Sequence, residues 1–177
     1  MRRFFAGIGL SLLLAMWLEF FYKFGATHDP KNFVGALLVY SIYLLVLHGV
    51  WARAKAHRRW VMYGVGGFIG LMAEWFVIGN SPWGNPEAAQ LIVQLGMFVF
   101  HAVYPVVGFM LARGMESAGP RRRYLRLLAW MSAISVLGWL LPKGTPQFMW
   151  FLLVPLTYYF IASVILLRRR KPVEAAL

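Results

Sequence analysis

The chain contains no cysteine and few acidic residues. Its 177 residues include 6 aspartates and glutamates against 18 lysines and arginines. The absence of cysteine excludes disulfides, thiolate nucleophiles and metal sites built on cysteine. Charged residues make up only 14% of the chain, whereas a soluble domain carries about a quarter. This composition does not fit an ordinary water-soluble domain, and the few acids stand out as candidates for a special role.

Apolar residues are abundant and are concentrated in long runs. They make up 60% of the chain, and a helix needs ~20 mostly apolar residues to cross a bilayer. Six runs reach about this length: 4–24, 33–52, 60–79, 88–112, 124–141 and 147–167. The connectors are too short for a separate soluble domain, so we predict an all-α fold, a bundle of six transmembrane helices in a single transmembrane domain, 1–177. The basic and apolar start looks like a signal peptide, but no small-residue cleavage site follows, so we interpret it as the first span.

The basic residues are distributed unevenly between the connectors. If the first residue lies in the cytoplasm and the spans alternate, 15 of the 18 basic residues fall on the cytoplasmic side, and the exceptions are Lys23, Lys31 and Lys143. This positive-inside pattern predicts cytoplasmic N- and C-termini in a multi-pass protein of the inner (plasma) membrane. Basic clusters of this kind contact the anionic head groups of membrane lipids. The net charge of +12 therefore does not predict nucleic-acid binding.

Two of the acids, Glu19 and Glu74, lie inside apolar runs, where an ionisable group is costly. Residues four apart share one face of a helix. Counting back by fours from each glutamate gives only small residues: Gly7, Ser11 and Ala15 before Glu19, and Gly66 and Gly70 before Glu74. Stripes of small residues mark faces where membrane helices pack closely. We therefore predict that both carboxylates face the interior of the bundle.

The fourth run carries a continuous polar face. Its members recur at spacings of three and four: Gln90, Gln94, Met97, His101, Tyr104 and Gly108. Weaker versions occur in the second run (Ser41, Leu45 and His48) and in the fifth (Ser132, Ser135 and Trp139). We expect these faces to meet inside the bundle.

The positions of these groups predict a polar cavity. With a rise of ~1.5 Å per residue, Glu19 and Glu74 lie roughly 9 Å below the outer surface, and His101 lies roughly 20 Å below it, near mid-membrane. We predict a cavity that opens outward. Its candidate acid–base, or catalytic, residues are Glu74, Glu19 and His101, and its candidate ligand-binding residues are Gln94, Gln90, Tyr104, Trp75 and Asn80.

Purely structural roles are the alternative for the same residues. Lys23 follows Glu19 by four positions, which is the favourable order for a salt bridge on one helix. Glu74 has no basic residue at the corresponding positions of its own helix. His101 could be a core histidine bonded to a backbone carbonyl. Both readings stay open on the sequence alone.

Four functions are compatible with this pattern. The first is a protein that binds or transports a small molecule or ion, with proton linkage as an option, because intramembrane acids and histidines serve proton relay and recognition of polar groups. The second is an intramembrane acid–base enzyme (an isomerase, hydratase or cyclase) acting on a lipid or isoprenoid, whose apolar substrate would contact the aromatic residues, 17% of the chain. The third is a b-type haem protein with His48 and His101 as ligands. The fourth is an accessory subunit of a membrane complex.

The first reading needs neither a cofactor nor a metal, and it is our lead. Six short spans make a small transporter, so we expect a homodimer or a larger membrane complex. Whether the chain is an enzyme is left open.

The first two helical hairpins also share a short pattern. Glu19 is followed by two aromatic residues and then by Gly25, and Glu74 is followed by two aromatic residues and then by Gly79. The third hairpin contains no matching acid. A duplication would explain the pattern, although the matching positions are few.

Overall fold

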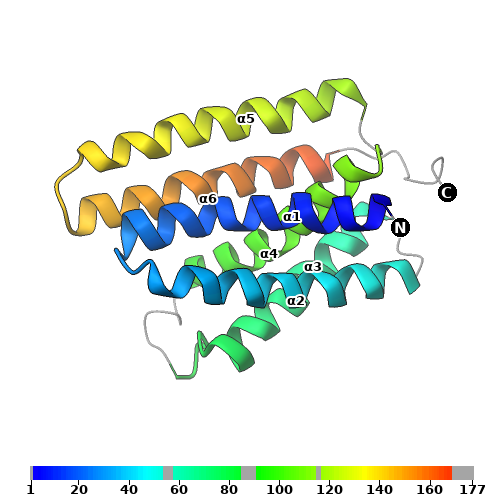
Figure 1. Ribbon diagram of the computed structural model, residues 1–177, viewed down its shortest axis with the longest axis horizontal. Coiled ribbons are helices and arrows are strands. Elements are labelled where there is room, and N and C mark those ends of the chain that lie inside the picture. Colours follow the sequence, from blue (N-terminus) through cyan, green and yellow to red (C-terminus); the bar gives the residue numbers. More distant parts are fainter. Residues whose placement is uncertain (1, 54–57, 85–90, 115–116, 169–177) are drawn as a thin grey trace.

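The computed structural model describes residues 2–53, 58–84, 91–114 and 117–168, which fold into a bundle of α-helices without a strand in those ranges (Figure 1). The helices are α1 (Arg2–Phe20), α2 (Lys31–Arg53), α3 (Arg59–Ala73), α4 (Leu91–Ala112), α5 (Ala118–Val136) and α6 (Thr145–Leu167). The predicted all-α fold is confirmed. Each predicted run overlaps one of these helices, although the ends of several runs differ from the helix ends.

Five helical segments of the described residues are long and apolar enough to cross a membrane, when α1 and α3 are counted together with the turns that continue them: Arg2–Ala26, Lys31–Trp51, Arg59–Ile78, Leu91–Ala112 and Thr145–Leu167. The exception within the described ranges is α5, whose first half carries four exposed arginines: Arg121, Arg122, Arg123 and Arg126. The run predicted at 124–141 therefore begins inside a helix that starts earlier, at Ala118, and ends in a short 3₁₀ turn, η3 (Leu137–Leu140). In Figure 1, α5 lies at the edge of the bundle along α6. The chain is a helical membrane-type bundle, and a crossing by α5 stays a prediction.

Helix α4 lies at the centre of the bundle. Its largest interfaces are with α1 and α3, and every residue from Val99 to Met110 is buried. A Cβ at Gly108 would overlap the backbone and hydroxyl of Ser11 on α1, and a Cβ at Gly70 on α3 would overlap the His101 ring. The two small-residue stripes therefore pack closely, in both cases against α4, and both glutamates are buried, as predicted.

Both acid-bearing helices end in a wide π-helical segment. Helix α1 continues into η1 (Phe21–Ala26), and α3 continues into η2 (Glu74–Ile78). Such segments are rare and recur at functional sites. The two π-helical segments coincide with the sequence pattern that follows Glu19 and Glu74, in which aromatic residues precede Gly25 and Gly79. The two hairpins therefore resemble each other in structure at this point as well as in sequence. Gly79 closes η2 with a φ of 90°, a backbone conformation that glycine adopts without strain.

The buried face of α2 differs from the predicted one. The residues that face the bundle are Tyr40, Tyr43, Leu44, Leu47, His48 and Trp51. Of the expected set, only His48 belongs to this face. The Ser41 hydroxyl donates to the carbonyl of Leu37 on its own helix, and the Leu45 side chain is 49% exposed. A serine hydroxyl can bond to a carbonyl of its own helix. A serine therefore indicates the buried face of a helix less reliably than the tyrosines do.

On α5 the expected serines do face the bundle. Ser135 is buried, and the Ser132 hydroxyl accepts a 2.8 Å hydrogen bond from the Trp17 indole of α1. Trp139 lies in η3 and is 41% exposed. The face predicted for the fifth run is therefore confirmed for its two serines and only in part for Trp139.

The close contact between α1 and α4 gives the first prediction. Gly108→Ala is expected to lower the free energy of unfolding by about 1–3 kcal/mol, because the added methyl group forces the two helices apart. Thermal or denaturant unfolding in detergent measures the change. Gly9→Ala on α1 is the matched control, because nothing lies within 4 Å of a Cβ at that position. Equal tolerance of both substitutions would contradict the packing described here.

Candidate functional site

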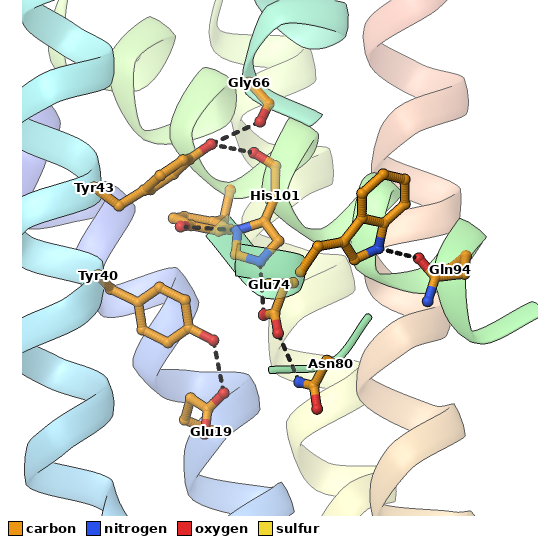
Figure 2. A network of polar contacts seen from close by, with 10 residues as sticks. Glu19, Tyr40, Tyr43, Gly66, Glu74, Asn80, Gln94 and His101 are labelled. Atoms are coloured by element: carbon orange, nitrogen blue, oxygen red, sulfur yellow. Dashed lines mark hydrogen bonds and ion pairs between the residues drawn. The ribbon is translucent and has the colours of Figure 1, made fainter. Parts of the chain in front are cut away.

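A carboxylate and an imidazole meet between α3 and α4. Glu74 is the first residue of η2, and its Oε1 lies 3.0 Å from Nε2 of His101, in the middle of α4 (Figure 2). The two residues are 6% and 2% exposed. Ionisable groups withdrawn from water in this way need partners, and each is the other's partner. The contact joins two residues that the sequence predicted as an acid–base set.

Asn80 holds the second oxygen of Glu74. Its Nδ2 donates to Glu74 Oε2 over 2.7 Å, and its backbone N–H donates to the Glu74 carbonyl over 2.9 Å. The turn at Gly79 makes both contacts possible because it brings the chain back over the end of η2. Both carboxylate oxygens of Glu74 are thus engaged. Asn80, predicted as a ligand-binding residue, supports the acid in this structure.

The second ring nitrogen of His101 lies near a tyrosine hydroxyl. His101 Nδ1 lies 3.5 Å from the Tyr104 hydroxyl, one turn further along α4. If Nε2–H donates to an ionised Glu74, Nδ1 accepts from Tyr104; a proton on Glu74 reverses the first bond. Glu74, His101 and Tyr104 therefore form a line of groups through which a proton can be exchanged.

Glu19 on α1 is connected to the surroundings of His101 through Tyr40 on α2. The Tyr40 hydroxyl donates to Glu19 Oε1 over 2.8 Å, and the Tyr40 ring lies 6.0 Å from the His101 ring (Figure 2). The Tyr40 ring also lies 5.9 Å from the Tyr104 ring. The two acids therefore lie on the same polar cluster, as predicted. Sequence reasoning missed Tyr40, although it shares a helical face with His48, eight positions later, and that periodicity could have revealed it.

Tyr43 is the second tyrosine that the sequence reasoning missed. Pro105 has no N–H to donate to the carbonyl of His101, four residues earlier. The Tyr43 hydroxyl lies 3.3 Å from this carbonyl oxygen and 2.8 Å from that of Gly66 on α3. The single hydroxyl proton, shared between these two oxygens, partly replaces the missing donor and links α2, α3 and α4 beside the imidazole.

The remaining predicted residues lie on one side of the cluster. The Trp75 indole donates to Gln94 Oε1 over 2.7 Å, and the Trp83 ring packs edge-on against Trp75 at 5.0 Å. These contacts connect η2, its following turn and α4. Gln90 lies outside the described residues.

The contacts of the two acids differ from those that the helical spacing suggested. A depth difference of roughly 10 Å between Glu74 and His101 was expected from the helical rise, yet their side chains touch. The helices cross obliquely, as α3 does in Figure 1, and the long side chains close the remaining gap. Nor does an ion pair join Glu19 to Lys23 in the described structure: Glu19 bonds Tyr40, and Lys23 Nζ lies 5.2 Å from the Tyr22 ring centroid.

The cluster is closed in this structure. Glu19 is 8% exposed, and His101 and Tyr104 are 2% and 0% exposed. The polar groups bond one another across the helix interfaces. An opening of this region toward the outer side therefore stays a prediction.

The histidines are placed poorly for joint haem ligation. Both ring nitrogens of His101 face protein groups, Glu74 and Tyr104. His48 Nδ1 lies 3.0 Å from the carbonyl of Leu44, and a Cβ at Gly7 of α1 would lie 3.5 Å from its Nε2. Within the described ranges there is also no cluster of three or more acids and histidines that could hold a metal ion.

Comparisons of the chain with protein-family models, with curated proteins and with solved structures gave no match.

The histidine contacts predict an absorption spectrum without a haem band. We expect the purified protein to be colourless, even after expression with added haem precursor, because iron would have to displace Glu74 from His101. A Soret band in the visible spectrum of the wild type, lost in His101→Ala, would contradict this expectation.

A second prediction concerns Tyr43. Tyr43→Phe is expected to lower the free energy of unfolding by about 1–2 kcal/mol, because the His101 carbonyl loses its donor. The loss should be smaller in a Pro105→Ala background, where residue 105 regains an N–H, and a double-mutant cycle measures this difference. Tyr63→Phe, which removes a part-buried hydroxyl bonded to Ser163, is the control. Losses that simply add would show that Tyr43 does not serve this carbonyl.

Proposed function

We propose that this protein is a small membrane carrier that binds a polar or cationic small molecule or ion beside the Glu74–His101 pair. The observation that carries the proposal is the 3.0 Å contact between these two groups, both buried, in a bundle of apolar helices. Intramembrane acids and histidines are expensive and serve mostly in ion and substrate pathways. The contact also joins two different helices, so a ligand that competes for either group changes how α3 and α4 are held together.

The surroundings of the pair support binding from one side. Asn80 and Trp83 lie in the segment that follows η2, and Trp75 lies in η2; Asn80 holds Glu74 in place. A ligand that enters past this segment would meet the carboxylate first and the imidazole behind it. Displacement of Asn80 would free one carboxylate oxygen for a cationic or hydrogen-bonding group.

We further propose that the site opens on the outer side of the inner (plasma) membrane. The charge distribution supports this, because the connectors at the opposite end of the helices hold most of the basic residues. Membrane lipids are the expected partners of these basic ends. A homodimer, or a larger membrane complex, fits the small size of the chain.

A second candidate function is an acid–base enzyme acting on a lipid or isoprenoid. The observation that favours it is the ring of aromatic side chains around His101: the centroids of Tyr40, Tyr43, Phe100 and Tyr104 lie 5.0–6.0 Å from that of the imidazole. Such rings suit an apolar substrate and can stabilise a cationic intermediate. The carrier ranks first because the Glu74–His101 and Glu19–Tyr40 contacts each tie two helices together.

The carrier function predicts that Glu74→Gln strongly reduces uptake. A thermal-shift screen in detergent with amines, zwitterionic amino acids, carboxylates and sugars first selects a solute, and uptake of the radiolabelled solute is then measured in proteoliposomes. We expect Glu74→Gln and His101→Gln to reduce uptake at least about tenfold, which corresponds to about 1.4 kcal/mol of lost interaction. Tyr63→Phe, whose hydroxyl bonds Ser163 on another face of the bundle, should transport like the wild type.

Two outcomes would count against the carrier. One is uptake by Glu74→Gln at the wild-type rate, with both variants folded. The other is an absence of any stabilising or transported solute together with a lipid-like molecule, detected by mass spectrometry, that copurifies with the wild type and not with the Glu74→Gln variant. The second outcome would favour the enzyme.

A further inference from the structure

The two buried acids have different partners. Glu74 is bonded to an imidazole and to an amide. Glu19 accepts one hydrogen bond, from the neutral Tyr40 hydroxyl, and its Oε2 is buried without a hydrogen-bond partner among the described residues. The residue is 8% exposed. Both carboxyl oxygens of Glu74 therefore have hydrogen-bond partners, whereas only one oxygen of Glu19 has a partner in the described part of the chain, although the two acids lie in similar sequence patterns.

We infer that Glu19 binds a proton in this closed state and is the proton-coupling site of the carrier, separate from the Glu74–His101 pair. The coupling role rests on the proposed transport function, whereas the protonation of Glu19 does not. An ionised carboxylate without a cationic partner is far more expensive to bury than the neutral acid. The single neutral donor that Glu19 has is compatible with the neutral acid, whose carbonyl oxygen accepts from Tyr40.

The charged and titratable groups around Glu19 agree with this assignment. Lys23 lies one turn away on its own helix without an ion pair to it, and the Glu74–His101 pair lies in the same polar cluster, on η2 and α4. The neighbouring tyrosines are Tyr40 on α2, Tyr104 on α4 and Tyr159 on α6, and the Tyr159 hydroxyl already donates to the Leu14 carbonyl. Among these described groups, Lys23 and a protonated His101 are the available cations, and His101 is engaged by Glu74.

Lys23 provides a partner for the ionised form. It follows Glu19 by four residues, in the order that favours a pair on one helix. Its ammonium group now lies over the Tyr22 ring. Release of the proton would leave a carboxylate that exchanges the Tyr40 hydroxyl for this ammonium group. Protonation thereby decides whether Glu19 holds α1 against α2 or pairs within its own helix.

Infrared difference spectroscopy tests the protonation directly. A protonated carboxyl group has a C=O stretching band above the amide I region, whereas a carboxylate does not. In membranes at neutral pH we expect this band in the wild type and in Glu74→Gln, and we expect its loss in Glu19→Gln. Glu19→Gln is neutral and nearly isosteric and keeps an oxygen that can accept from Tyr40, so it should fold.

A second variant covers the case in which Glu19→Gln does not fold. Tyr40→Phe should move the band to higher frequency, because the carbonyl of Glu19 loses its hydrogen bond. A wild type without the band would overturn the inference. So would a band that persists in Glu19→Gln and disappears in Glu74→Gln, because the proton would then be on Glu74.

Uptake measurements separate this inference from the proposed function. With the solute selected in the thermal-shift screen, an inward proton gradient should accelerate uptake by the wild type and no longer accelerate it in Glu19→Gln. A band assigned to Glu19 together with a complete absence of uptake would refute the carrier and leave the protonated acid in place. Gradient-driven uptake that is unchanged in Glu19→Gln would refute the coupling role.

Discussion

The hydrogen bond between Glu74 and His101 is the interaction on which the rest of the site depends. It places two ionisable groups inside a helix bundle where each, alone, would be an unpaired and costly polar group. Two neighbouring residues make this hydrogen bond possible. Gly70 leaves room for the imidazole, since any side chain there would overlap the ring. Asn80 fixes the carboxylate from the other side, through both its side chain and its backbone.

The same interaction connects the site to the backbone of α4. Pro105 lies one turn after His101 and removes the donor that the His101 carbonyl would otherwise have. Tyr43 partly replaces that donor from α2 and also reaches Gly66 on α3. The imidazole, its own carbonyl and the two flanking helices thus form one hydrogen-bonded unit. A ligand or proton that changes the charge of His101 would therefore act on three helices at once.

The two acids show how similar sequence patterns take different roles. Each follows a stripe of small residues and adjoins a π-helical segment. Glu74 pairs with an imidazole because α3 places it against His101. Glu19 faces Tyr40 of α2, a neutral group, and has no charged partner within hydrogen-bonding distance in the described structure. The difference lies in the neighbouring helix, and it assigns the acids to separate tasks in the proposed mechanism.

The sequence by itself determined the helical class, five of the apolar spans and the inward direction of both glutamates, because composition, run length and the i, i+4 spacing are local properties. It also predicted that Glu74, His101 and Tyr104 lie on converging faces. It could not determine that Glu74 and His101 touch, that Tyr40 and Tyr43 complete the cluster, or that Glu19 does not pair with Lys23. Those outcomes depend on how obliquely helices cross, and on which side chains of other helices compete for each polar group. Only the tertiary structure decides them, because packing distant segments together creates partners that no local pattern contains.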